Sequence, residues 1–156
     1  MEYPFEPRST AHLQPGQFWA IRLGAAQFAC GRVMQLVERE GKRHPRIFLA
    51  GLSSWFGTTE PTDMAIAGHS VLEQGELHVK SIREAGGTVL GHRELSADGI
   101  VPSYFLDQAG GATCMLLQGT TPIRRASADD IARIPVLRTW GYGVPTILAR
   151  KYLRLV

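Results

Sequence analysis

The chain has 156 residues, of which 44% are hydrophobic and 20% charged, and its formal net charge is +3. This length and composition are typical of one globular domain with a buried core, and they exclude an intrinsically disordered chain. No apolar run approaches the roughly 20 residues that cross a bilayer, and the start, MEYPFEPRST, is unlike a secretory signal, so we expect a cytoplasmic protein without a membrane partner.

The N-terminal part of the chain predicts an extended arm followed by a β-hairpin. Residues 1–13 show no hydrophobic period and contain two prolines, so we interpret them as an extended N-terminal arm. Residues 14–37 hold two apolar runs around Gly24, which suits a tight reversal. Gly31, in the returning run, is at a position for a bulge or a close backbone approach. The first run alternates as a half-buried strand requires. One face would carry Trp19, Ile21 and Leu23, and the other would carry Phe18, Ala20 and Arg22.

The middle of the chain predicts further strands and one long loop. Residues 46–51 form a third apolar run, and three adjacent strands with short connections favour a strongly bent antiparallel sheet or a small β-barrel. Residues 52–68 are rich in Ser, Thr, Gly and Pro. We interpret them as a loop whose Trp55 and Phe56 either pack over a core edge or present a contact surface. Residues 70–82 suit a strand and a helix equally.

The next elements are expected to be short. Residues 88–95 suit a strand, and residues 104–106 and 113–118 resemble paired strands. Ser127 and Asp130 form a capping-box pattern that opens a helix over 128–134.

The C-terminal end predicts a loop and a last helix. The loop carries Trp140 and Tyr142 between glycines. The amphipathic helix, 146–155, has an apolar face of Leu148, Ala149, Tyr152, Leu153 and Val156. We therefore predict a single α+β domain, 1–156, with a few short helices, one of them C-terminal.

The search for catalytic and metal sites gives one polar candidate. The histidines have no standard metal-ligand spacing and the two cysteines belong to no zinc motif, so we expect no metal and no cofactor. Cys30 and Cys114 lie in apolar segments and are expected to be reduced and buried. No nucleophile elbow surrounds Ser53 or Ser54, and we assign no catalytic residue. His92 remains as the alternative polar site.

Two functions from other classes stay open as alternatives. One is a small-barrel module that binds nucleic acid or a small ligand, which would need Arg22, Arg32 and Arg46 on one exposed face. The basic residues are spread in short groups rather than in a stripe with aromatic platforms, so the sequence does not favour nucleic acid. The other is a hydrolase that uses His92 with a nucleophile or carboxylate within hydrogen-bond reach.

The stretch PGQFWAIRLGAAQFACGRV resembles the start of the immunity protein 26 family of bacterial polymorphic toxin systems. Members of that family begin with Pro-Gly, an aromatic-containing strand that ends in Leu, a short Gly turn and a Gly-Arg-Val strand. Residues 88–92, TVLGH, are similar to a later family stretch in which a strand ends in Gly-His. The turn differs, since two alanines replace a more polar pair. The matching positions are Pro15, Gly16, Phe18, Ile21, Leu23, Gly31, Arg32 and Val33.

The resemblance implies a small intracellular protein that binds and neutralises a cognate toxin by occluding its active site, without catalysis of its own. Such a surface relies on a few aromatic or Arg anchors. Inhibitors of basic nuclease toxins tend to be acidic, so the positive charge of this chain points to an acidic or non-nuclease toxin. The candidate toxin-binding residues are Trp55, Phe56, Trp140, Tyr142 and Arg32.

Overall fold

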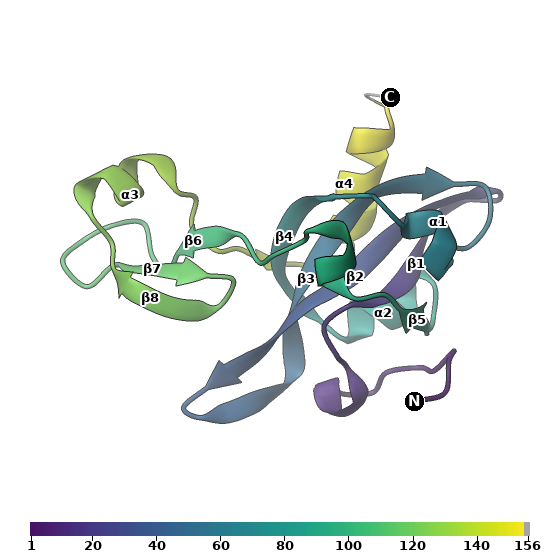
Figure 1. The fold of residues 1–156 in the computed structure, drawn as a ribbon, viewed down its shortest axis with the longest axis horizontal. Coiled ribbons are helices and arrows are strands. Elements are labelled where there is room, and N and C mark those ends of the chain that lie inside the picture. The colour runs from purple at the N-terminus through teal and green to yellow at the C-terminus, as the bar shows by residue number, and fades with distance from the viewer. Residues whose placement is uncertain (155–156) are drawn as a thin grey trace.

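The computed structural model describes residues 1–154, which form an α+β structure with two β-sheets (Figure 1). The larger sheet contains β1 (Gln17–Gly24), β2 (Gln27–Arg39), β3 (Lys42–Gly57), β4 (Val71–His78), β5 (Val89–His92) and β9 (Thr139–Trp140). Its strand order is β5-β1-β2-β3-β4-β9. The smaller sheet contains β6 (Tyr104–Leu106), β7 (Met115–Gln118) and β8 (Thr121–Arg125), in that order. The predicted α+β class is confirmed.

The helices are short, as predicted. They are η1 (Thr10–His12), α1 (Asp63–Ile66), α2 (Lys80–Ala85), η2 (Leu95–Asp98), α3 (Ala128–Arg133) and α4 (Val144–Leu153). The predicted capping box opens α3, because the Ser127 hydroxyl accepts the Asp130 N–H and the Asp130 carboxylate accepts the Ser127 N–H. The predicted end of the last helix, Leu155, and its apolar residue Val156 lie outside the described residues. Of the helices that the structure describes, none is long and apolar enough to cross a membrane.

The larger sheet is bent but open. Strands β2 and β3 have 13 and 16 residues, and their pairing shifts register at three places, each of which bends the hairpin. The neighbouring strands pair antiparallel, except that β9 pairs parallel with β4. Strands β5 and β9 lie at opposite edges, so the sheet does not close into the small barrel that the sequence allowed.

Strand β3 is longer than the sequence predicts. The expected loop over 52–68 is wrong in its first third, because β3 continues to Gly57. This part of the strand pairs with β2, where Phe56 lies opposite Ala29, and with β4, where Ser53 lies opposite Val71. Ladder hydrogen bonds to two neighbours outweigh the low strand propensity of its serines and glycine. The ambiguous stretch 70–82 divides into β4 and the start of α2.

Both faces of the larger sheet are buried. On β1, Trp19 and Ile21 face the helices α2 and α4, whereas Phe18 and Ala20 face α1. The predicted alternation is therefore correct, but the strand is not half-buried, since Phe18 and Ala20 are each 2% exposed. A third cluster, Met34, Leu49 and Ile100, lies farther along the second face. Helices on each side explain why the central parts of these strands are mainly apolar.

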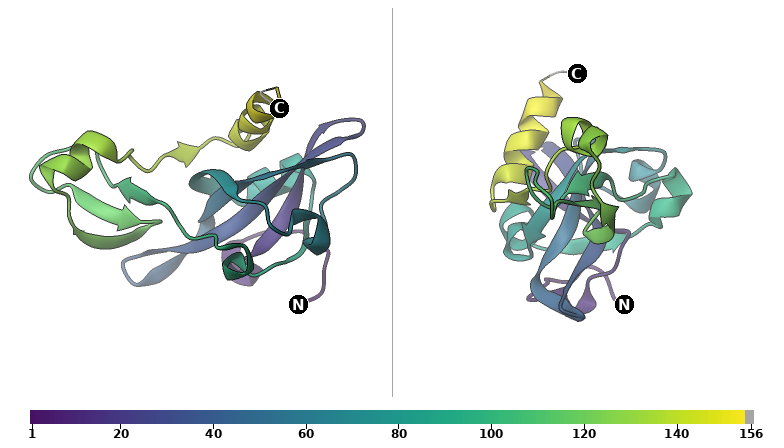
Figure 2. Two further views of the ribbon diagram at one scale, coloured as in Figure 1. Left: turned by 45° about the horizontal axis from the view of Figure 1, so that its top comes forward. Right: turned by 90° about the vertical axis from the view of Figure 1, so that its left-hand side faces the viewer.

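Residues 104–137 form a part that we call the outer lobe, which contains β6, β7, β8 and α3. It extends away from the larger sheet, as Figures 1 and 2 show. Polar side chains of the larger sheet hold it in place. Gln35 on β2 accepts from the N–H and the hydroxyl of Thr120, at 2.9 and 3.1 Å, and its amide donates to the Thr121 hydroxyl at 2.9 Å.

Candidate functional site

Arg32 is a buried cation at the junction of three chain segments. Its side chain is 1% exposed, on the α1 side of β2. The guanidinium donates to the carbonyl oxygens of Gly16 at 3.3 Å and Arg93 at 2.6 Å. The Arg93 N–H in turn donates to the Gly16 carbonyl at 3.0 Å. Arg32 therefore joins the start of β1, the middle of β2 and the end of β5.

Gly16 and His92 complete this junction. Gly16 has φ +99°, and a Cβ there would lie 2.7 Å from the Arg93 oxygen and 2.8 Å from Nε2 of His92, so a larger residue does not fit. His92 Nε2 donates to the Pro15 carbonyl at 3.0 Å. We call these five residues, Pro15, Gly16, Arg32, His92 and Arg93, the Arg32 junction.

A second ionic cluster lies beside the Arg32 junction. The Arg93 guanidinium donates twice to Asp98, at 2.8 and 2.9 Å, and once to Asp63 at 2.9 Å. Asp98 also accepts the Gly68 N–H at 2.8 Å. The hydrogen bonds from Arg93 lower the pKa of Asp98 to about 2 and raise the pKa of Arg93. Burial lowers the pKa of Arg32, whose guanidinium forms no ion pair with a carboxylate of residues 1–154.

The chemistry of the Arg32 junction is structural. Arg32 is surrounded by backbone carbonyls, and its Nε has no hydrogen-bond partner among the described residues. A side chain with 1% exposure cannot contact a partner, so the structure does not support Arg32 as a toxin-binding residue. Its burial also removes the exposed face of Arg22, Arg32 and Arg46 that a nucleic-acid module needed.

Three of the other predicted contact residues lie mainly in the core. Trp55 and Trp140 are each 8% exposed, and Phe56 is half-buried against the main cluster. Trp55 packs with the α1-side cluster, whereas Trp140 belongs to the cluster on the opposite face. The structure therefore does not bring these aromatic residues together on one surface.

Tyr142 is the predicted contact residue that is exposed, at 44%. Its ring lies 5.4 Å from the His78 ring in an edge-on arrangement, and the Lys80 ammonium lies 5.3 Å from the ring centre. Its carbonyl accepts the Ser81 hydroxyl at 2.7 Å, which fixes the loop onto α2. Partial burial, followed by the nearby cations Arg46, Lys80 and Arg83, lowers the pKa of His78.

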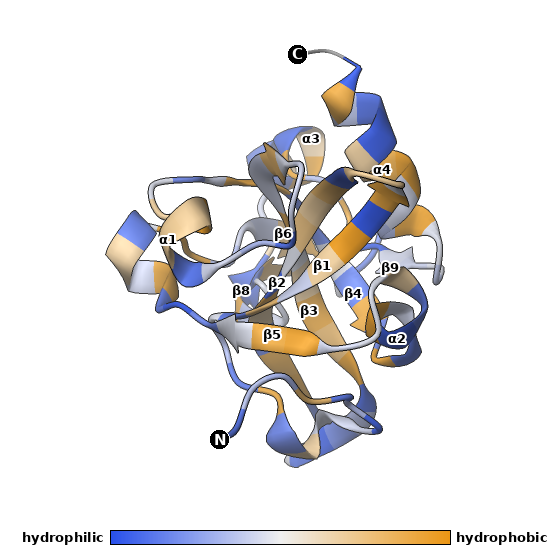
Figure 3. Ribbon diagram, turned by 90° about the vertical axis from the view of Figure 1, so that its right-hand side faces the viewer, coloured by the Kyte–Doolittle hydropathy of each residue, from blue (hydrophilic) through white to orange (hydrophobic). Residues whose placement is uncertain are grey.

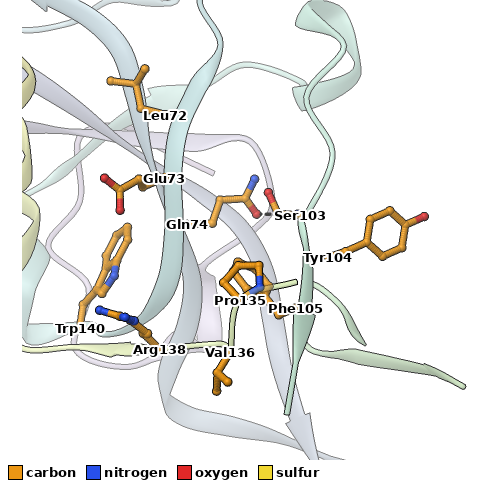
Figure 4. Close-up of a pocket in the computed structure, with 10 residues that line it drawn as sticks. All are labelled: Leu72, Glu73, Gln74, Ser103, Tyr104, Phe105, Pro135, Val136, Arg138 and Trp140. Carbon is orange, nitrogen blue, oxygen red and sulfur yellow. Dashed lines mark hydrogen bonds between the residues drawn. The ribbon is translucent and has the colours of Figure 1, made fainter. Parts of the chain in front are cut away.

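A cleft of about 570 Å³ lies between β4 and the outer lobe. Glu73, Trp140 and Arg138 lie on one side of it, and Gln74 hydrogen-bonds the Ser103 N–H on the other (Figure 4). Glu73 accepts the hydroxyl of Tyr152, at 2.7 Å, which raises the pKa of that tyrosine. Within residues 1–154 the Arg138 guanidinium forms no ion pair. This volume is in the range of small-molecule sites.

The reactive side chains occupy structural positions. His92 contacts Pro15 and lies 3.7 Å from Glu94, and no serine or cysteine side chain of the described residues is hydrogen-bonded to it. Cys30 is fully buried, which raises the pKa of its thiol to about 12, and Cys114 is also buried and unpaired, as predicted.

One serine–histidine contact does occur. The Ser54 hydroxyl lies 3.1 Å from Nδ1 of His69 and also accepts the Ser70 N–H at 3.1 Å. No carboxylate among the described residues hydrogen-bonds this histidine, so the pair lacks the third group that orients a catalytic base. Among residues 1–154, no group of three or more His, Cys, Asp or Glu is placed to hold a metal ion.

Sequence reasoning missed the ionic cluster and the cleft. Arg93 follows His92 in the sequence and Asp98 lies in an Asp-Gly turn, but neither spacing indicates a contact across the α1 side of the sheet. The cleft depends on where the outer lobe lies, which no local pattern specifies. A comparison of the chain with family models, with curated proteins and with solved structures gives no match.

Proposed function

We propose that this chain is a non-catalytic immunity protein that resides in the cytoplasm and neutralises a cognate bacterial toxin by binding it. The observation that carries the proposal is the Arg32 junction. The resemblance to the immunity protein 26 family includes three short stretches, Pro15-Gly16, Gly31 to Val33, and Gly91-His92. These stretches contact one another, because Arg32 donates to the Gly16 carbonyl and His92 donates to the Pro15 carbonyl.

This convergence makes the short resemblance more informative. Isolated small residues match many sequences by chance, but residues that contact one another are constrained together. Gly16 cannot carry a side chain because a Cβ would clash with His92 and Arg93. Gly31 cannot carry one because a Cβ would clash with the ring of Trp19. The motif therefore describes a framework for a sheet, and we infer that the toxin inhibitors of that family share this framework.

Inhibition is expected to work by occlusion of the toxin's active site. A stable inhibitor buries about 1,600 Å² in total at its interface and depends on a few exposed anchors. Because Trp55, Trp140 and Arg32 serve the core, Tyr142 is the predicted anchor that remains available on the surface.

A second candidate function is the binding of a small ligand in the cleft. The observation that favours it is the cleft itself, where the charged groups of Glu73 and Arg138 lie near the indole of Trp140 (Figure 4). Such a site suits a small planar or zwitterionic compound. Saturable quenching of tryptophan fluorescence by such a compound, abolished in Arg138→Ala, would favour this function.

The test of the proposed function is co-purification and growth rescue. The tagged chain is co-expressed with the polypeptide encoded beside it, and cell growth is compared with and without the chain. Stable co-purification together with rescue supports the immunity function. If the neighbouring polypeptide is toxic and the chain neither binds it nor restores growth, the proposal fails.

A further inference from the structure

A basic surface surrounds Tyr142. We define the Tyr142 patch as Tyr142 with Arg46, His78, Lys80 and Arg83. These residues come from β3, β4, α2 and the loop before α4, and hydrogen bonds hold the segments together. The Val79 N–H donates to the Arg46 carbonyl at 2.9 Å, and the Ser81 hydroxyl donates to the Tyr142 carbonyl at 2.7 Å.

A shallow hollow of about 470 Å³ adjoins the Tyr142 patch. Arg83 of α2 and Thr146 of α4 line it. Arg22 also lines this hollow, but its guanidinium lies 5.4 Å from the ring centre of Phe28, which belongs to the α1-side cluster, so its charge is directed to the other face of the sheet. Figure 3 shows this side of the molecule, with hydrophilic bands on α2 and α4. The cations of the Tyr142 patch are therefore gathered by the fold, although they are scattered in the sequence.

The carboxylates on this surface only partly balance the cations. Glu84 lies 3.8 Å from the Lys80 ammonium, and Glu6 lies 4.0 Å from the Arg83 guanidinium. All four side chains are between 38% and 53% exposed, so each pair is long and solvated. Exposed pairs of this kind contribute about 0–1 kcal/mol, and they separate readily when a partner arrives.

We propose that the Tyr142 patch is the surface on which an acidic partner protein docks. This inference rests on the proposed function, with the cognate toxin as the partner. Tyr142 supplies a large, rigid contact, and the surrounding cations supply charge complementarity to Asp and Glu side chains. Such complementarity steers association and selects the partner.

A protein partner fits this surface better than a nucleic acid does. Base stacking needs an open aromatic face, whereas the Lys80 ammonium lies over the Tyr142 ring, 5.3 Å from its centre, and the His78 ring packs against it in a T-shaped arrangement. Glu6 and Glu84 also lie among the cations, where they would repel a phosphate backbone. In a protein interface, mixed charges of this kind are ordinary.

The test compares two variants of equal net charge. Lys80→Glu with Arg83→Glu reverses two cations of the Tyr142 patch. Lys42→Glu with Arg125→Glu reverses two exposed cations elsewhere, neither of which forms an ion pair within the described part of the chain. Tyr142→Ala is the third variant. The affinity of each for the neighbouring polypeptide is measured at low and high salt, after thermal unfolding has shown that each variant is folded.

We expect the patch variant to bind roughly a hundredfold more weakly, about tenfold for each reversed charge, and to lose most of the salt dependence. Tyr142→Ala is expected to weaken binding roughly thirtyfold. The control variant is expected to bind within about threefold of the unmodified chain, since its charges are remote.

The outcomes separate the inference from the proposed function. If the unmodified chain binds and rescues growth but the patch and control variants bind equally well, this inference is overturned and the proposed function stands. If the unmodified chain neither binds nor rescues, the proposed function fails and the inference fails with it. Tight binding of a DNA or RNA oligonucleotide, lost only in the patch variant, with unchanged toxin binding, would overturn the inference in favour of nucleic acid.

Discussion

The indole of Trp140 on β9 lies directly over Gly75 on β4, so close that a Cβ on Gly75 would be 2.4 Å from the ring. The same relationship recurs between β1 and β2, where a Cβ on Gly31 would be 2.2 Å from the ring of Trp19. Each glycine leaves the space above its strand that a neighbouring tryptophan fills. These pairs fix how β1 and β9 lie against the centre of the sheet.

Substitution of Gly75 tests this packing. We expect Gly75→Ala to destabilise the protein by about 1–3 kcal/mol, because the added methyl group displaces the indole of Trp140. Urea unfolding measures the effect. Gly24→Ala is the matched control, since a Cβ there meets nothing within 4 Å, and its unfolding midpoint should change little. Equal stabilities of the two variants would contradict this account.

Alanine variants of the two aromatic residues near α4 separate stability from binding. Trp140→Ala removes a side chain that is 8% exposed and should cost about 3–5 kcal/mol of unfolding free energy. Tyr142→Ala removes an exposed ring and should change stability by no more than about 0.5–1 kcal/mol. Loss of growth rescue in Trp140→Ala would therefore report unfolding, whereas loss in Tyr142→Ala would report a lost contact. Circular dichroism during heating distinguishes the two cases.

The buried arginine should matter more for folding than any exposed one. Arg32→Met leaves the Arg93 carbonyl without its donor, at a cost of about 1–3 kcal/mol, whereas the Gly16 carbonyl keeps the Arg93 N–H. We therefore expect a loss of about 1–3 kcal/mol in urea unfolding. Arg125→Met, at an exposed position on β8, is the control and should stay within about 0.5 kcal/mol of the unmodified chain. A neutral Arg32→Met would show that the junction does not stabilise the sheet.

The Arg93–Asp98 pair predicts a pH dependence of stability. Arg93 holds the pKa of Asp98 at about 2 in the folded state, below its ordinary 3.8, so the folded state binds this proton more weakly than the unfolded chain does. The stability from this pair is therefore complete above about pH 4 and is lost as the pH falls through about 2. Asp98→Asn should be less stable at pH 7 and show a shallower decline across that window.

The measurement for this pair is urea unfolding at a series of pH values. Asp129→Asn breaks an exposed ion pair with Arg133 and serves as the control. Its free energy of unfolding at neutral pH should change by roughly a few tenths of a kcal/mol. If Asp98→Asn and the unmodified chain declined in parallel between pH 4 and pH 2, the pair would not be the source of the dependence.

Local patterns predicted the elements with strong local signals. The alternation of β1 and the capping box of α3 each follow from neighbours in sequence. The extension of β3 through Trp55 did not, because its ladder partners on β2 and β4 are distant and supply the hydrogen bonds that its own composition disfavours.

The candidate site was harder to predict for the same reason. Trp55 and Trp140 are aromatic residues in glycine-rich stretches, a pattern that suits an exposed anchor and a core residue equally. The glycines beside them decide between the two, since Gly57 and Gly75 leave room for the indoles. The sequence offers Arg32 as an anchor because interfaces rely on aromatic or Arg residues, and only the folded chain shows the two carbonyls that receive its guanidinium.

The outer lobe leaves and rejoins the chain's main body at neighbouring points. The Leu106 N–H donates to the Pro135 carbonyl at 2.8 Å, and the Leu137 N–H donates to the Leu106 carbonyl at 2.9 Å. The two ends of the lobe therefore lie side by side. The segment between them can change in length without moving any strand of the larger sheet. A change in the length or shape of this lobe would therefore reshape the cleft while leaving the Arg32 junction intact.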